Sequence, residues 1–440
     1  GTGLVVIASG SITLNSILAN DNAHAIPNAD PDLAGQFSGI FLQNSCIDCT
    51  FGVTIKNSYY NNEFNRNSNI SLIDTLTTAP RGVGINIRTY GPLVIRGASA
   101  SDNGQHGAYL INNDSILNNV SIFDSRFESN RLTGLWAQTL GNITLSNVTA
   151  GNSSMQTAML YDTEPDPGYK GGGAYLVNVA DFTGYKNVTV LNSRFDNNYG
   201  VGLRIISNGA IRLVNVSASN NVTSAAADPF GAYISNIGSP PEVSAGISIT
   251  GTSLLTNQFN NNALADGIFI RTTGRLVLNN IAASGNGVNG IYYSNTANTN
   301  TTSVSTIAAN NNQFAGIYIA SKGQVTGYGI IANQNGAGIN QAAAGMPFTF
   351  LAAASVYISN TASTTGTAGV LINRSQFNEN LSTGLRVYSN SNITVNNIQA
   401  IGNRTADPAP PSNLRIDGAY LQNTSSPFAV SIRVLSSDRK

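Results

Sequence analysis

Histidine and cysteine, the side chains most often used for catalysis and metal binding, occur only twice each in this chain. His106 comes directly before a predicted strand, His24 lies in an insertion, and no cluster of metal-binding residue types surrounds either one. Both are interpreted as surface or turn histidines. Cys46 and Cys49 form a Cys-x-x-Cys motif, but a redox motif of this kind needs a βαβ context that the sequence does not predict. A local disulfide between them is favoured over free thiols.

Acidic residues are concentrated in insertions that precede repeated strands, where loop oxygens could hold calcium. These residues are Asp30, Asp32, Asp162, Glu164, Asp166, Asp228 and Asp407. They lack a fixed D-x-D-x-D spacing, and Asp-Pro is common in ordinary turns. We therefore predict no metal and no cofactor, with calcium as the minor alternative.

A third set of candidates consists of aromatic and arginine side chains at one position of a repeated six-residue segment. The set is Phe41, Tyr109, Trp136, Tyr175, Arg204, Tyr233, Phe269, Tyr292, Tyr318, Tyr357, Arg386 and Tyr420. In a strand of pattern G-h-x-h the two h positions point inward, so x points outward. The sequence predicts an outward stripe, which either stabilises the sheet by stacking or contacts a glycan or a second solenoid.

The segments that position these residues repeat along the chain in two alternating types. One type, such as GAYLIN at 107–112, ends in asparagine, and the other, such as GLRIIS at 202–207, ends in serine or threonine. The asparagines are Asn44, Asn112, Asn178, Asn236, Asn295, Asn360 and Asn423. Because stacked asparagines can satisfy backbone groups at buried turns, they are predicted to form a structural ladder.

A second, alternating strand pattern follows each segment, for example VTVLNSRFDNN at 188–198. Short strands separated by Asn and Gly turns, without helical periodicity, predict an all-β fold. Self-similarity at a fixed period indicates a solenoid, here a parallel β-helix of about 14 coils in two-coil repeats of about 63 residues. The prediction is one continuous domain over residues 1–440, without end caps.

Composition narrows the classes of partner. The net charge is zero and 10% of residues are charged, which argues against nucleic acid as a ligand. No apolar run approaches the roughly 20 residues of a membrane-spanning helix, so no membrane span is predicted.

The patterns N-x-x-G-h-x-h and V-x-I-x-N resemble those of right-handed parallel β-helix proteins of the pectate-lyase-like superfamily, especially repeat regions of large bacterial surface proteins and adhesins. The resemblance implies a right-handed helix. Sugar-cleaving members carry Gly-His-Gly and Arg-Ile-Lys motifs, from which Gly104-Gln105-His106-Gly107 and Arg415-Ile416-Asp417 both depart. No carboxylate pair within reach of a glycosidic bond is visible. We therefore expect that the chain is not an enzyme.

The two ends of the chain are out of step with the repeat. Residues 3–22 align without gaps to residues 202–221, a coil of the second type, and the last coil is of the first type. Head-to-tail association, or continuation within a longer chain, would complete the repeat. An excised fragment is the simpler explanation.

Together these features predict a non-catalytic structural β-solenoid at the cell surface or outside the cell. It would serve as a building block of a fibre, sheath or adhesin stalk, with self-association and an extracellular glycan as its expected contacts. The alternative is a β-helix that binds or cleaves a polysaccharide.

Overall fold

The computed structural model describes residues 2–22, 38–44, 51–57, 61–67, 82–112, 118–154, 171–179, 185–221, 230–236, 245–254, 256–295, 297–337, 354–363, 368–404, 417–424 and 431–435. Every regular element in these ranges is a β-strand, and none of them contains a helix that could cross a membrane. The contacts divide the chain into two units. The first comprises Gly1–Gly209 and Val216–Pro229, and the second comprises Ala210–Asn215 and Phe230–Lys440.

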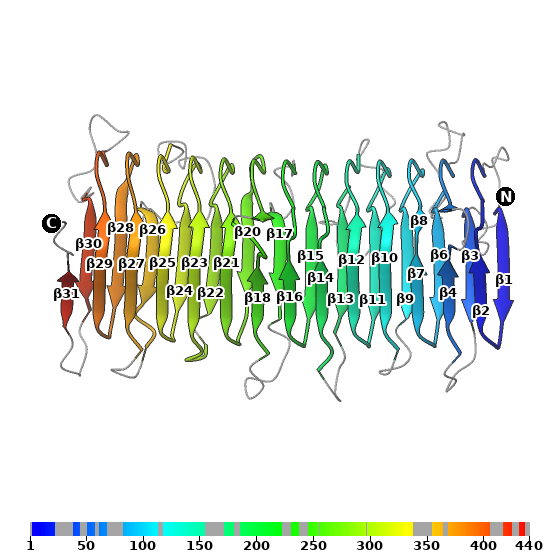
Figure 1. Ribbon diagram of the computed structural model, residues 1–440, viewed down its shortest axis with the longest axis horizontal. Coiled ribbons are helices and arrows are strands. Elements are labelled where there is room, and N and C mark those ends of the chain that lie inside the picture. Colours follow the sequence, from blue (N-terminus) through cyan, green and yellow to red (C-terminus); the bar gives the residue numbers. More distant parts are fainter. Residues whose placement is uncertain are drawn as a thin grey trace, which may run out of the picture. The chain divides into compact units, whose positions relative to one another are not determined.

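The repeated G-h-x-h segments form the strands of a first parallel sheet in each unit (Figure 1). In the first unit these strands are β1 (Leu4–Ala8), β3 (Ile40–Asn44), β6 (Ile85–Thr89), β9 (Ala108–Asn112), β11 (Leu135–Thr139), β13 (Ala174–Asn178) and β15 (Leu203–Ser207). In the second unit they are β17 (Phe230–Ser235), β20 (Asp266–Arg271), β22 (Ile291–Asn295), β24 (Ile317–Ser321), β26 (Ala354–Asn360), β28 (Thr383–Ser389) and β30 (Ala419–Asn423). Within each unit, each strand pairs with the equivalent strand of the next coil.

The alternating segments form the remaining sides of each coil. In the first unit they are β2 (Ile12–Asn15), β4 (Val53–Lys56), β5 (Asn62–Glu63), β7 (Leu93–Arg96), β8 (Ala98–Ser99), β10 (Val120–Arg126), β12 (Ile143–Thr149) and β14 (Val188–Leu191). In the second unit they are β16 (Ile211–Val214), β18 (Ile247–Thr250), β19 (Asn257–Gln258), β21 (Leu276–Ala282), β23 (Thr302–Ala308), β25 (Val325–Ile331), β27 (Val370–Gln376), β29 (Ile393–Gln399) and β31 (Ile432–Leu435). Left-handed residues bend this side of the coil, as at Asp124 (φ 51°) and Asn147 (φ 55°).

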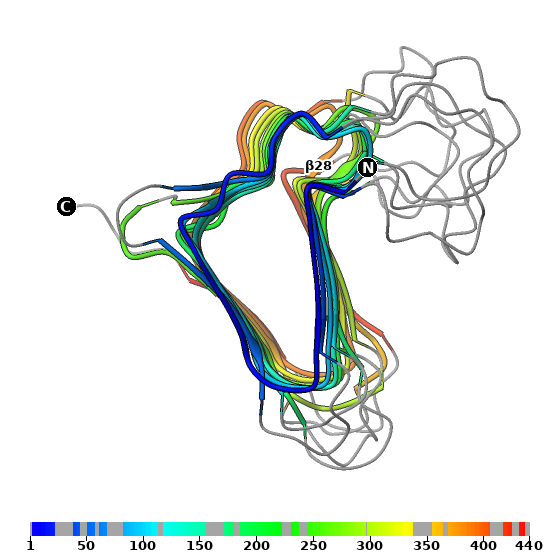
Figure 2. The ribbon, with the colours of Figure 1, turned by 90° about the vertical axis from the view of Figure 1, so that its right-hand side faces the viewer.

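The first sheet contains seven strands in each unit, in agreement with the predicted number of about 14 coils. Viewed end on, successive coils of one unit superpose (Figure 2). The predicted all-β, right-handed parallel β-helix is confirmed. Whether the two units form one continuous domain over residues 1–440 stays a prediction.

The core alternates large and small side chains from one coil to the next. Phe127 and Phe195 are fully buried, and Ala150 lies in the coil between them. The serine two residues before each phenylalanine bridges neighbouring coils: Ser193 Oγ accepts a hydrogen bond from Val148 N at 3.1 Å and donates to Leu191 O at 2.7 Å. These serines therefore satisfy backbone groups where the strand bends.

Replacing Ser193 with alanine is expected to lower the free energy of unfolding by about 1–2 kcal/mol, because Val148 N would be left buried without an acceptor. Urea unfolding measures the loss. Arg194→Ala is a suitable control, since this side chain is exposed and its ion pair with Asp196 contributes little. Equal losses in the two variants would contradict the bridging role of the serine.

A ladder of asparagines fills the turn that leads into the first sheet. In each pair, one Oδ1 accepts hydrogen bonds from the backbone N and the Nδ2 of the previous asparagine at 2.8–3.4 Å. The members are Asn22, Asn67, Asn103 and Asn130, then Asn198 and Asn221, in the first unit, and Asn262, Asn286, Asn312, Asn335, Asn380 and Asn403 in the second. The glycine that follows is required by close packing, since a Cβ on Gly107 would lie 2.5 Å from Asn130 Nδ2.

This ladder is not the predicted one. Six of the seven predicted asparagines, Asn44, Asn112, Asn178, Asn236, Asn295 and Asn360, are buried, and Asn423 is half-buried. Where the register between strands includes one of these asparagines, its partner on the neighbouring coil is a serine, threonine or alanine, as Ser207 is for Asn178. The amides of five of them, Asn44, Asn112, Asn178, Asn236 and Asn360, donate instead to turn carbonyls, for example Asn360 Nδ2 to Gly323 O at 2.6 Å. They are turn-capping residues, whereas the asparagine-to-asparagine contacts lie at the other end of the strand.

Candidate functional site

The candidate site lies on the outward side of the first sheet. We define the outer row as the residues at the middle outward position of its strands. In the first unit the register places in line Phe41, Asn86, Tyr109, Trp136, Tyr175 and Arg204. In the second unit it places in line Tyr233, Phe269, Tyr292, Tyr318, Tyr357, Arg386 and Tyr420. Within each unit, therefore, the stripe predicted from the sequence occupies equivalent positions on neighbouring strands.

In four consecutive pairs of the second unit the aromatic rings are stacked parallel to each other. Their planes differ by 1–6° and their centroids are 4.7–5.5 Å apart, from Tyr233 through Phe269, Tyr292 and Tyr318 to Tyr357. Each ring therefore covers the faces of its neighbours. A sugar ring that stacks on an aromatic side chain needs a free face, so the inner rings of this stack offer a ligand their edges and hydroxyl groups instead.

The outer row is more buried than an outward stripe is expected to be. Trp136 is 4% exposed, Tyr357 9%, and Arg204 and Arg386 7% each. The prediction that all members project into solvent is wrong for these four. The remaining members, apart from Asn86 (5%), are half-buried. The exposed edges that a ligand could reach are those of the half-buried members.

Burial also acts on the phenol groups of the stack. It raises the pKa of Tyr292, Tyr318 and Tyr357 above that of a free tyrosine, because the charged phenolate is poorly solvated there. The negative charge of Asp266 adds to the effect on the pKa of Tyr292, whereas Arg271 opposes it. All three tyrosines are therefore neutral hydrogen-bond donors at physiological pH.

Asp266 is the one strongly perturbed carboxyl group among the described residues. It opens strand β20, is 3% exposed, and accepts two hydrogen bonds on Oδ1, from the backbone N (2.9 Å) and Nδ2 (2.8 Å) of Asn289. Burial raises the pKa of Asp266 to about 7, even though both hydrogen bonds lower it. Near neutral pH this carboxyl group exists in both forms, as an acid–base catalyst must.

Asp266 and the exposed Arg271 begin and end strand β20, and Tyr292 lies on the neighbouring strand β22. Phe269, between Asp266 and Arg271 on the same strand, is directly opposite Tyr292 in the register. The acid and the guanidinium group thus lie at the two ends of the strand that carries Phe269, and both act electrostatically on the pKa of Tyr292. The sequence analysis missed Asp266, whose only signal is a carboxylate directly before the glycine of the segment GIFIRT.

In the first unit the outer row has a different geometry. Trp136 lies edge-on to Tyr175, with a centroid separation of 4.3 Å and planes at 77°. His106 is 4% exposed, and its ring centroid lies 5.6 Å from that of Tyr109 and 6.1 Å from that of Trp136. The interpretation of His106 as a surface histidine is therefore wrong: it belongs to a buried aromatic cluster. Asp417, from the second incomplete motif, belongs to the other unit.

Several predicted features lie outside the described residues. These are Cys46, Cys49 and His24, together with all the acidic insertion residues considered for calcium. The described ranges contain no group of three or more His, Cys, Asp or Glu side chains placed to hold a metal ion. The disulfide and the calcium site therefore stay predictions, as do head-to-tail association and a fibre or adhesin role.

No protein-family model and no curated protein matches the chain. Among solved structures it is similar to the A-module of the mannuronan C-5 epimerase AlgE4 from Azotobacter vinelandii, with 12% identity over 96% of this chain and 91% of that chain and a TM-score of 0.33. It is also similar to a double mutant of the periplasmic alginate epimerase AlgG (11% identity, 86% and 84% coverage, TM-score 0.37) and to the A-module of AlgE6 from A. vinelandii (12%, 98% and 91%, 0.30). The likeness concerns the fold. All three named proteins are epimerases, contrary to the prediction that the chain is not an enzyme.

Proposed function

We propose that the outer row of the second unit binds an extended acidic polysaccharide and that Asp266, Tyr292 and Arg271 carry out acid–base chemistry on it. The observation that supports this most directly is that Asp266 and Arg271 lie on either side of Phe269 on strand β20, and that Phe269 stacks on Tyr292 of strand β22. A repeating row of ring edges suits a repeating ligand, because neighbouring coils present the same contact about every 4.8 Å.

Each of the three side chains has a distinct role in this proposal. The Arg271 guanidinium is exposed and binds the carboxylate of a uronate, since planar guanidinium groups pair with carboxylates through two hydrogen bonds. The Asp266 carboxylate removes the proton from the sugar carbon beside that carboxylate. The same group, now a carboxylic acid, returns a proton to this carbon, while the neutral Tyr292 hydroxyl donates a hydrogen bond to the sugar. An extracellular or cell-surface location agrees with such a ligand.

The test measures binding and proton exchange separately. Polymannuronate and polygalacturonate oligomers are titrated calorimetrically, and deuterium uptake from D₂O into the sugar carbon is followed by NMR. Arg271→Gln is expected to weaken binding by about tenfold. Asp266→Asn is expected to keep binding but to slow deuterium uptake by about 100-fold or more, the usual contribution of a general base.

Tyr328→Phe is the matched control for Tyr292→Phe. Tyr328 lies on strand β25 of the other sheet, where its hydroxyl accepts a hydrogen bond from Arg374 Nη1 at 2.8 Å. Only Tyr292→Phe is expected to weaken uronate binding. Failure of both polyuronates to bind, or unchanged exchange in Asp266→Asn, would refute the proposal.

A further inference from the structure

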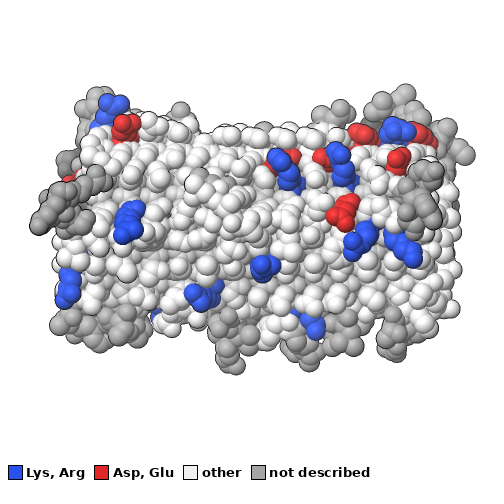
Figure 3. Space-filling view, in the orientation of Figure 1, with Lys and Arg blue, Asp and Glu red and all other residues white. Residues whose placement is uncertain are grey.

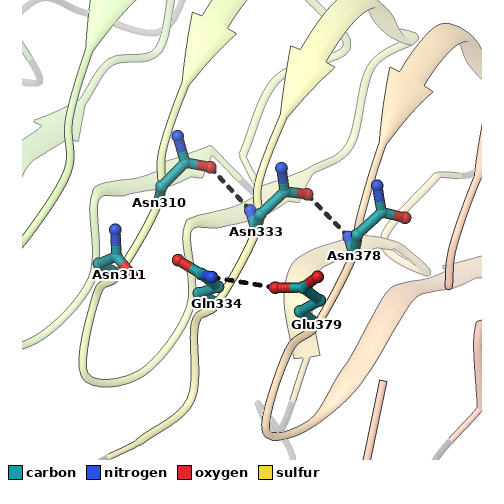
Figure 4. Close-up of a pocket in the computed structure, with 6 residues that line it drawn as sticks. All are labelled: Asn310, Asn311, Asn333, Gln334, Asn378 and Glu379. Atoms are coloured by element: carbon teal, nitrogen blue, oxygen red, sulfur yellow. Dashed lines mark hydrogen bonds between the residues drawn. The ribbon is translucent and has the colours of Figure 1, made fainter. Parts of the chain in front are cut away.

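A second polar surface lies away from the outer row, where strands β23, β25 and β27 turn toward the next strand of the first sheet. It is a shallow depression of about 260 Å³ (Figure 4). Its lining residues are Asn310, Asn311, Asn333, Gln334, Asn378 and Glu379. Five amides and one carboxylate thus converge from three consecutive coils. We call this surface the amide depression.

One row of the amide depression has its amide groups fixed in a common orientation. Asn333 N donates to Asn310 Oδ1 at 2.8 Å, and Asn378 N donates to Asn333 Oδ1 at 2.7 Å. Because the oxygens are engaged with the backbone of the next coil, the amide nitrogens of Asn310 and Asn333 point together away from these contacts (Figure 4). Among the described residues neither nitrogen has a hydrogen-bond partner, so both donors are available to a ligand.

The second row supplies acceptors. Asn311, Gln334 and Glu379 are exposed and all adopt the left-handed conformation, with φ between 55° and 57°. Gln334 Nε2 donates to Glu379 Oε2 at 3.0 Å. This contact fixes the two side chains and leaves Gln334 Oε1 and Glu379 Oε1 as acceptors. Donors and acceptors therefore face the same shallow space at the spacing of the coils.

The charge of this turn differs between the two units. In the first unit the equivalent left-handed positions carry an ion pair, Arg66 Nε to Asp21 Oδ1 at 2.7 Å, and acidic side chains gather toward the N-terminal end of the face in Figure 3. In the amide depression Glu379 is the one charged lining residue. Without a cation in its lining, the depression disfavours anionic ligands such as phosphates and uronates.

We propose that the amide depression is a binding site for a neutral oligosaccharide. Sugar hydroxyl groups donate and accept hydrogen bonds at once, which matches paired amide donors and amide or carboxylate acceptors. The hydroxyl groups of a neutral polyol can also donate hydrogen bonds to the carboxylate of Glu379, and hydrogen bonds to ionised groups are stronger than those to neutral groups. This site is separate from the outer row and takes a ligand of different charge, so it stands independently of the proposed acid–base chemistry.

The test variant is Asn333→Asp. An aspartate keeps the oxygen that accepts from Asn378 N, but it removes the amide donor and adds a negative charge beside Glu379. Cellohexaose, maltohexaose and mannohexaose are the probes, titrated calorimetrically and by NMR. We expect at least one of them to bind, and Asn333→Asp to weaken its binding by about tenfold or more.

Asn65→Asp is the matched control. Asn65 occupies the same position in the first unit, before a left-handed residue and a ladder asparagine, and its Oδ1 accepts from Ser101 N at 2.8 Å. Its replacement is expected to leave hexasaccharide binding unchanged. The inference is overturned if none of the three hexasaccharides binds, if Asn333→Asp binds like the wild type, or if Asn65→Asp causes an equal loss. Urea unfolding verifies that each variant is folded.

Discussion

Replacing Asn312 with leucine is expected to lower the free energy of unfolding by about 4 kcal/mol, because several buried polar groups lose their partners at once. Asn312 Oδ1 accepts from the backbone N and the Nδ2 of Asn286 at 3.0 and 2.9 Å. Its own Nδ2 donates to Ala283 O and to Asn335 Oδ1, both at 3.0 Å. Leucine fills a similar volume but makes none of these four hydrogen bonds.

The measurement is the urea midpoint of the full chain, followed by tyrosine fluorescence. Asn311→Gly serves as the control. Asn311 is the adjacent residue, exposed and left-handed with φ 57°, and glycine adopts that conformation without steric cost. Its midpoint should stay close to that of the wild type. A similar midpoint for Asn312→Leu would show that the ladder contributes little to stability.

Replacing Asp266 with asparagine is expected to make the protein more stable than the wild type by a margin that grows from pH 5 to pH 7 and then stays constant. The pKa of Asp266 is about 7 in the folded chain, against an ordinary value of 3.8. Between these values the folded state holds a proton that the unfolded state has released, so the stability of the wild type falls as the pH rises. Each pH unit in this window costs about 1.4 kcal/mol.

Asparagine does not titrate, and its Oδ1 can still accept both hydrogen bonds from Asn289. The stability advantage of the variant should therefore be about 3 kcal/mol larger at pH 8 than at pH 5, as measured by urea unfolding at pH 5, 6, 7 and 8. Tyr292, whose pKa is raised, stays neutral over this range. Parallel pH profiles for the two proteins would mean that Asp266 is ionised in the folded state.

The strands and their register could be predicted from sequence because they depend on local patterns. The segment G-h-x-h fixes which side chains point inward, and its repetition fixes which residues lie opposite one another, as for Phe269 and Tyr292. The asparagine ladder was accessible too, since Asn103, Asn130 and Asn198 each stand four residues before a glycine. The ladder was predicted instead at the repeated asparagines that end the strands, such as Asn112.

The remaining features depend on neighbours that are distant in sequence. The inward and outward pattern gives the direction of a side chain, but its burial also depends on what packs over it, so Trp136 and His106 could not be identified as buried. Asp266 could not be singled out from the sequence, because the desolvation that raises its pKa arises only in the folded chain. The amide depression likewise exists only after Asn310, Asn333 and Asn378 are brought together from three coils.

The stack of parallel rings also makes the second unit optically distinct from the first. Parallel aromatic rings at 4.7–5.5 Å are close enough for their electronic transitions to couple, whereas the rings of the first unit are tilted by 39–77° where they meet. The second unit should therefore dominate an exciton signal in the near-ultraviolet circular dichroism spectrum. Loss of this signal would follow the unfolding of its coils, while Trp136 fluorescence reports separately on the first unit.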